Sequence, residues 1–183
     1  MSRRLALSVV CVLWAVESGV KAQPASQQAP GTPPATLPGG ASQIQETHGD
    51  WRVNCQRTKE VTCVVAQQQA DKDTRQLVLG IELKALSTEK AEGTLVLPFG
   101  LAVSQPVTLQ VDESPGTKLT FRTCVPVGCL VPLTFEGAAL SALKKGTVLA
   151  VKANASDGVQ EAGFRISLNG LSGALERALA LGK

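Results

Sequence analysis

The chain is poor in residue types on which catalysis and recognition commonly depend. It has no tyrosine and a single histidine, His48. Histidine is the usual base beside a catalytic serine, and no G-x-S-x-G motif is present, so serine-hydrolase chemistry is not expected. Aromatic residues are few, and after residue 22 each lies in or beside an apolar segment, which favours the core over an exposed binding platform. These residues are Trp51, Phe99, Phe121, Phe135 and Phe164.

A large excess of charge is also missing. The formal net charge is +3, and no basic block stands out. Non-specific binding to nucleic acid depends mainly on phosphate neutralisation, and polybasic segments attract membrane surfaces. Neither partner is therefore predicted.

No complete metal or cofactor motif is present. Asp71, Asp73 and Glu82 have the spacing of the first, third and twelfth positions of a calcium-binding loop. Arg75 and Gln76, however, occupy the positions of a ligand and of the turn glycine. We predict no catalytic residue, no cofactor and no metal site.

Residues 1–22 are typical of a secretory signal peptide. Arg3 and Arg4 precede an apolar run, and small residues end the segment at Ala22. The run has about a dozen residues, whereas a membrane-spanning helix needs roughly 20. We therefore expect removal of the leader, no transmembrane segment in the mature chain, and a formal charge of about +1 after cleavage. The predicted location is the periplasm, or the outer membrane or cell surface.

Residues 23–47 are rich in proline, alanine and glutamine, and their only sizeable apolar residues are Leu37 and Ile44. Such a stretch buries too little apolar surface to offset its ordering entropy, which predicts a disordered tether. Apolar segments then recur without a linker, so residues 48–183 are predicted to form a single β-rich domain containing disulfides.

The domain is dominated by apolar–polar alternation, which is typical of half-buried strands. Segments with this pattern are 51–55, 77–83, 107–112, 119–122, 133–135, 148–153 and 164–168. Helical spacing of leucines appears at 138–145 and 172–181. We predict a mainly β fold, an antiparallel sandwich or barrel-like domain with one or two short helices, including a C-terminal helix. The glutamines at 67–69 are interpreted as an exposed strand edge.

Four cysteines lie outside the leader, and three pairings are open to them. Sequence proximity favours Cys55 with Cys63 and Cys124 with Cys129. A zinc site or a redox pair are the alternatives, but seven and four residues separate the cysteines, wider than the usual spacings of either. Structural disulfides formed in an oxidising compartment are the preferred interpretation.

Several stretches, in order along the chain, resemble one protein family. They are Gly-Asp-Trp-Arg-Val-Asn-Cys at 49–55, the segment after Cys63, Leu-Pro-Phe-Gly-Leu at 97–101, Phe-Arg-Thr-Cys-Val-Pro-Val-Gly-Cys at 121–129, and Ser-Leu-Asn-Gly-Leu at 167–171. Together they are similar to the invasion-associated locus B family of Gram-negative envelope proteins. Two positions depart from its pattern: Phe99 is the third residue of the "LPLG" turn, and Leu171 replaces a frequent aromatic residue.

The resemblance implies a secreted or periplasmic, mostly β protein with disulfides and no known catalysis, associated in pathogenic relatives with entry into host cells. We therefore expect a non-enzymatic envelope protein acting through contacts with a protein at the envelope or host surface. The alternative is a periplasmic binding or chaperone-like module that adds a client strand at a sheet edge. An enzyme would require a deep pocket holding Arg122, Asp112 or Glu113.

Overall fold

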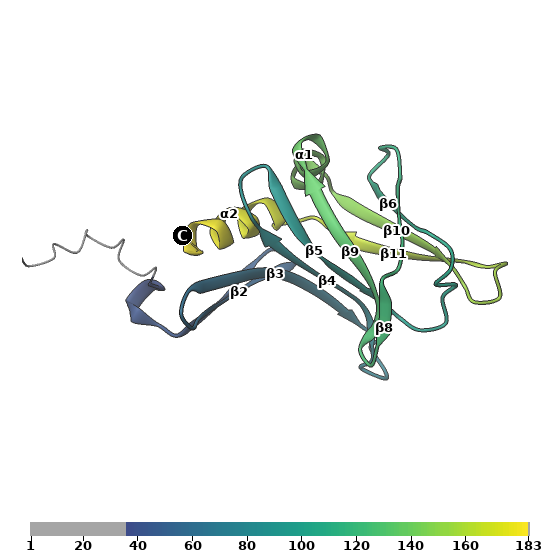
Figure 1. Ribbon diagram of the computed structural model, residues 1–183, viewed down its shortest axis with the longest axis horizontal. Helices are drawn as coiled ribbons and strands as arrows, with labels where there is room; N and C mark the ends of the chain where they lie inside the picture. Colours follow the sequence, from purple (N-terminus) through teal and green to yellow (C-terminus); the bar gives the residue numbers. More distant parts are fainter. Residues whose placement is uncertain (1–35, 183) are drawn as a thin grey trace, which may run out of the picture. The chain divides into compact units, whose positions relative to one another are not determined.

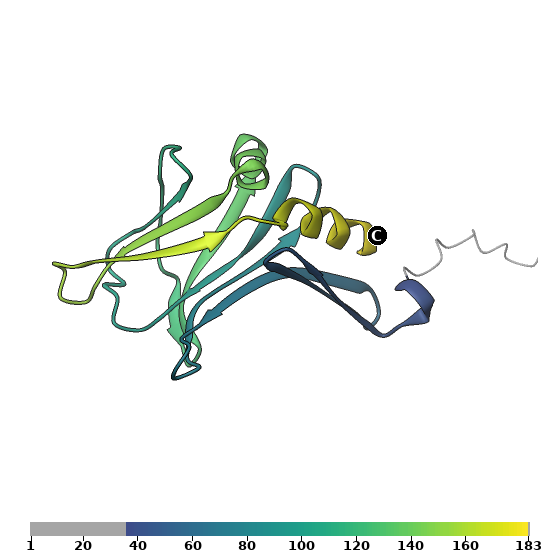
Figure 2. The same ribbon diagram turned by 180° about the vertical axis from the view of Figure 1, so that it is seen from behind.

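The computed structural model describes residues 36–182, which form two antiparallel β-sheets and two α-helices (Figures 1 and 2). The large sheet contains, in spatial order, β1 (Gln43–His48), β2 (Trp51–Arg57), β3 (Val61–Ala70), β4 (Leu77–Ala85), β5 (Lys90–Leu97), β9 (Gly128–Glu136) and β8 (Thr123–Val125). The small sheet contains β11 (Glu161–Ser167), β10 (Val148–Asn154), β6 (Val107–Val111) and β7 (Thr117–Leu119). The helices are α1 (Gly137–Lys145) and α2 (Leu171–Leu181), and a 3₁₀ turn, η1 (Pro38–Gly40), precedes β1. The predicted mainly antiparallel β fold with a C-terminal helix is confirmed.

The strands form because alternate side chains are apolar and point to one face of the sheet. In β2, Trp51, Val53 and Cys55 are buried, whereas Arg52 and Gln56 are exposed. This alternation leaves the large sheet with one face in the core and one polar outer face.

The C-terminal helix α2 covers part of the inner face of the large sheet. It packs on β2, β3 and β4, across which Figure 1 shows it lying. Its buried residues are Leu171, Ala174, Leu175, Ala178 and Leu181. Helix α1 follows β9 directly and buries Leu140 and Leu143.

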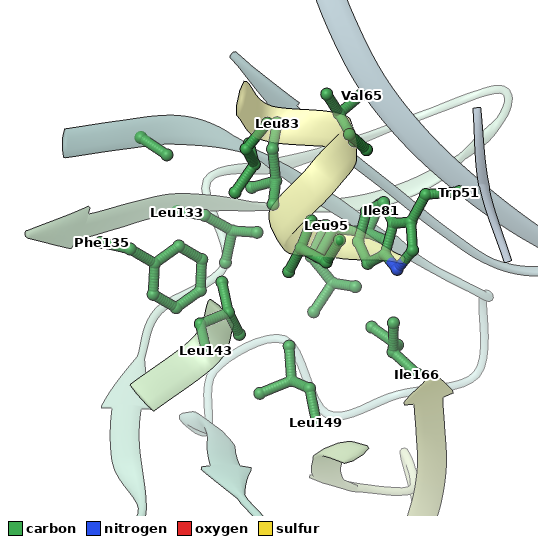
Figure 3. Close-up of a cluster of buried hydrophobic side chains, with 14 of the residues drawn as sticks. Trp51, Val65, Ile81, Leu83, Leu95, Leu133, Phe135, Leu143, Leu149 and Ile166 are labelled. Carbon is green, nitrogen blue, oxygen red and sulfur yellow. The ribbon is translucent and has the colours of Figure 1, made fainter. Parts of the chain in front are cut away.

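One hydrophobic core joins both sheets and both helices (Figure 3). Trp51 of β2, Leu143 of α1 and Ile166 of β11 are each 0% exposed. Full burial of a leucine or isoleucine contributes roughly 1.5–3 kcal/mol. The core therefore supplies the main cohesion between segments far apart in the chain.

The ordered fold begins before the predicted boundary at residue 48. Composition predicts a disordered tether over 23–47, but residues 36–47 carry η1 and most of β1, and Leu37 is 1% exposed. The strand form of β1 comes from its pairing with β2, in which Ile44 lies opposite Cys55. The predicted signal peptide and the rest of the tether lie outside the described residues.

The structure differs from the strand predictions in three further places. β5 has no predicted counterpart, and the strand expected at 119–122 is β7, which ends at Leu119. The glutamines at 67–69 are not simply exposed, because Gln67 is buried at 8% exposed and Gln69 is half-buried. Along this stretch β3 pairs with β4, whereas its pairing with β2 ends at Ala66.

Candidate functional site

The turn between β1 and β2 is hydrogen-bonded to the segment that precedes α2. Trp51 Nε1 donates to the carbonyl of Ser167 at 2.9 Å, and Ser167 Oγ donates to the Asp50 carboxylate at 2.6 Å. The backbone N–H of Asp50 donates to the carbonyl of Asn169 at 3.1 Å. These groups satisfy one another and leave this region with a structural role.

Close backbone approach explains a glycine in the same region. Gly170 has φ 88°, and a β-carbon there would lie 2.1 Å from the carbonyl oxygen of His48. Only glycine fits such a position. The stretches at 49–55 and 167–171, which carry part of the family resemblance, therefore meet and hold the fold together.

Two glutamines of β3 reach the outer edge of the small sheet. Gln67 Nε2 donates to the carbonyl of Ser167 at 3.0 Å, and Gln69 Nε2 donates to the carbonyl of Arg165 at 2.7 Å. Gln67 is buried, at 8% exposed. A buried amide without such a partner would be costly, so these glutamines are explained by the β11 carbonyls that they cap.

An ion pair fastens α2 to the edge strand β1. Arg177 donates two hydrogen bonds, from Nε and Nη2, to the Glu46 carboxylate, each at 2.8 Å. The hydrogen bonding from Arg177, outweighing the opposite effect of burial, lowers the pKa of Glu46 from 4.5 to about 2. His48 Nε2 lies 3.4 Å from the same carboxylate. The only histidine is therefore part of this junction. The side-chain partner of His48 is the Glu46 carboxylate and not a serine, threonine or cysteine side chain.

The residues considered for catalysis do not come together in a pocket. The Asp112 carboxylate accepts from the backbone N–H groups of Thr147 and Val148 at 3.0 Å each, and so stabilises a turn. Arg122 and Glu113 are exposed. Among residues 36–182, no group of His, Cys, Asp or Glu side chains is arranged to hold a metal ion.

Both disulfides join residues directly opposite each other in an antiparallel pair. Cys55 is bonded to Cys63 across β2 and β3, and Cys124 to Cys129 across β8 and β9. This is the pairing that sequence proximity favours. Cys129 lies in turn opposite Leu97 of β5, so the 97–101 turn and the 121–129 hairpin are neighbours.

An apolar surface lies where these two segments meet, which we call the sheet-end patch. It comprises Leu77, Pro98, Phe99, Pro126 and Val127, which line a hollow of about 530 Å³ together with Gln76 and Gly128. Phe99 and Val127 are 62% and 63% exposed. Figures 1 and 2 both place the β3–β4 loop beside the β8–β9 turn at this end of the large sheet.

The exposure of Phe99 corrects the expectation that every aromatic residue lies in or beside the core. Trp51 and Phe135 are buried, and Phe121 and Phe164 pack against the core. Phe99 instead stands between Pro98 and Gly100 at a turn. Its position between two turn-forming residues was the one signal in the sequence that could have indicated exposure.

Comparison with known proteins decides the family. The model of the family described as "Invasion associated locus B (IalB) protein" matches residues 51–179, a span that includes both disulfides and the sheet-end patch. This chain belongs to the invasion-associated locus B family. The resemblance noted from the sequence motifs is confirmed.

Relatives in the locus B family support the assignment along most of the chain. An invasion protein B homolog of Brucella abortus is 45% identical over 150 residues, covering 81% of this chain and 87% of the relative. Invasion protein B of Bartonella bacilliformis is 32% identical over 188 residues and covers all of both chains. The crystal structure of invasion associated protein B from Bartonella henselae matches with a TM-score of 0.70 at 35% identity, over 75% of this chain and 97% of that one.

Within residues 36–182, neither helix combines the length and the apolar character needed to cross a membrane. The family and the paired cysteines indicate an exported protein.

Proposed function

We propose that this locus B protein is exported and acts without catalysis, by binding a protein partner of the envelope or host surface through the sheet-end patch. The patch carries the proposal because large apolar side chains that remain exposed together mark interaction surfaces. Phe99 and Val127 line one hollow, so an apolar side chain of the partner can contact both.

The surroundings of the patch support a binding surface that keeps its shape. The Cys124–Cys129 disulfide closes the hairpin that presents Val127. A β-carbon at Gly128 would lie 2.5 Å from the carbonyl oxygen of Leu97, so the hairpin is packed closely on the β5 strand. A preformed surface loses less conformational entropy on binding than a mobile one.

A photo-crosslinking side chain at position 99 tests the partner contact in cells that produce the protein. Val159 is the matched control, because it is apolar and 87% exposed, lies in the β10–β11 turn, and is not among the residues that line the hollow of the patch. We expect a protein adduct of defined mass from position 99 and none from position 159. Equal adducts from both positions, or none from either, would contradict the proposal.

The double variant Phe99→Ser/Val127→Ser tests the same contact energetically. Removal of two central apolar residues of an interface should weaken binding of the identified partner at least about 30-fold. Val159→Ser should leave binding unchanged. If the double variant kept its affinity for the partner, the partner would have to bind at another surface, and the proposal would be contradicted.

Export is tested by protease access to the protein on intact and on lysed cells. Digestion on intact cells would locate the protein outside the outer membrane and favour a host-surface partner. Protection until the outer membrane is opened would indicate a periplasmic partner, and protection until complete lysis would contradict export.

A further inference from the structure

Among residues 36–182, β1 is an outer strand of the large sheet, and no strand pairs with its far side. The N–H of Arg57 donates to the carbonyl of Ser42 at 2.8 Å. This bond shows which residues of β1 direct their backbone N–H and C=O groups toward β2 and which direct them away from it. In an antiparallel pair, every second residue turns its backbone groups away from the partner strand. Counted from this bond, the backbone groups of Gln43, Gln45 and Thr47 point outward, and no described strand pairs with them.

Among the other outer strands of the described residues, two are short and one, β11, is capped over part of its length, whereas β1 is neither short nor capped. β7 and β8 have three residues each, and side chains from the large sheet occupy the Arg165 and Ser167 carbonyls of β11. β1 has six residues, with an unbroken register and no proline or lysine. Proteins normally block a long edge with one of these devices, because open edges pair with other strands.

The side chains beside the outward groups are uncharged. Gln43, Gln45 and Thr47 are all exposed on the outer face of the sheet. The carboxylate of β1, on Glu46, is held by Arg177 on the other face. A second β1 strand can therefore approach this edge without placing like charges opposite each other.

We propose that two copies of this chain pair through β1, antiparallel and around a two-fold axis at Gln45. Gln45 then lies opposite Gln45 of the other copy, and Gln43 lies opposite Thr47. Each of these facing pairs consists of outward-pointing residues, so each can exchange two backbone hydrogen bonds. The two large sheets become one continuous sheet across the axis.

The polar character of the edge favours a second copy over an apolar client strand. A hollow of about 240 Å³ adjoins β1 and is lined by Gln45, Asp50, Arg52, Asn54, Ala66, Gln67 and Gln68. Strand addition draws its specificity from pockets for alternate side chains. The hollow beside β1 is polar, so it matches glutamine and threonine, which β1 itself provides.

The dimer should be reversible. β1 contributes six residues per copy, fewer than the roughly 20–30 residues a side of a standard interface. Sedimentation velocity tests this on the full-length protein purified from the cells that produce it. As the protein concentration is raised, the average mass should increase from that of one copy to that of two.

Charge substitutions at position 45 test the axis itself. Gln45→Lys and Gln45→Glu each place like charges opposite each other, and each should raise the dimer dissociation constant by about fivefold. Mixing the two variants places opposite charges together and should restore association. Gln45→Ala is the matched control and should still dimerise, because it keeps the backbone N–H.

Gln45→Pro tests the backbone bonds. Its N–H points away from β2, so proline removes no bond from the folded monomer, whereas the dimer loses two bonds and should dissociate about 30-fold more readily. A wild-type chain that stays monomeric at every concentration would overturn the proposal. So would a dimer unaffected by Gln45→Lys, or a mixture of charge variants that does not associate.

Discussion

The Cys55–Cys63 and Cys124–Cys129 disulfides each join opposed residues of a hairpin, but their surroundings differ. Cys55 and Cys63 are 1% and 5% exposed and belong to the hydrophobic core shared by both sheets. In the second pair Cys124 is exposed and Cys129 is 2% exposed, and the hairpin that they close carries Pro126 and Val127 of the sheet-end patch. The first bond therefore belongs to the scaffold, while the second shapes a surface. A cysteine pair with short spacing does not by itself distinguish these two roles.

Removal of the buried disulfide should have the largest effect. We expect Cys55→Ala/Cys63→Ala to lower the free energy of unfolding by about 4 kcal/mol, from lost chain restraint and from the space left in the core. Urea unfolding followed by tryptophan fluorescence measures this, since Trp51 reports on the same strand. If the loss of unfolding free energy were no greater than that caused by removing the Cys124–Cys129 disulfide, the proposed difference in role between the two disulfides would be wrong.

Next in size should be a change where the first hairpin meets the segment before α2. Gly170→Ala should cost about 3 kcal/mol of unfolding free energy, because the new β-carbon meets the backbone of His48 and the residue has a positive φ. Gly173→Ala is the matched control, with its nearest neighbour 3.6 Å away. It should stabilise the helix by about 0.5 kcal/mol. Equal effects in urea unfolding would show that this contact is not close.

Removal of the exposed disulfide should cost less. We expect Cys124→Ala/Cys129→Ala to lower the free energy of unfolding by about 2 kcal/mol, since the bond closes a short loop and its loss leaves a smaller gap in the core. Its larger consequence should be mobility of Val127, seen as faster amide exchange in the β8–β9 turn. Unchanged exchange there would show that the hairpin keeps its shape without the bond.

A smaller, pH-dependent effect should come from Glu46. Its pKa is lowered on folding, so its contribution is complete above about pH 4.5 and is lost as the pH falls toward 2. Glu46→Gln should thus lower the thermal midpoint at pH 7, by less than removal of either disulfide. The gap between variant and wild type should close as the pH falls through this window. A gap independent of pH would assign the loss to packing instead.

The smallest effect on stability should come from the patch. Phe99→Ser/Val127→Ser should change the free energy of unfolding by no more than about 0.5 kcal/mol, because both side chains are mostly exposed. Urea unfolding provides the check. A loss above about 2 kcal/mol would show that these residues support the fold, and the binding proposal would lose its basis.

Apolar alternation was sufficient to predict strands such as β2, β4 and β10, because in each of them the apolar side chains lie on one face and that face is buried. It failed for β1, whose only large apolar residue is Ile44, and for β5, which begins Lys-Ala-Glu-Gly. Both become strands because neighbouring strands supply their hydrogen bonds. Sequence patterns do not contain that tertiary contribution.

The candidate site was predictable in part. The family motifs at 97–101 and 121–129 are visible in the sequence, but their adjacency depends on the pairing of β5 with β9. Gln67 and Gln69 were misread for a related reason: their hydrogen-bond acceptors lie about a hundred positions further along the chain. Polar residues in a buried strand become understandable only when those acceptors are known.

The distance along the chain between partners also constrains when the fold can be completed. Trp51 finds its hydrogen-bond acceptor 116 residues later, and Glu46 finds Arg177 131 residues later. Contacts of such separation carry a loop-closure cost and form slowly. During synthesis, the indole of Trp51 therefore gains its acceptor only after Ser167 has emerged. The β1–β2 hairpin is thus completed by segments that are made more than a hundred residues after it.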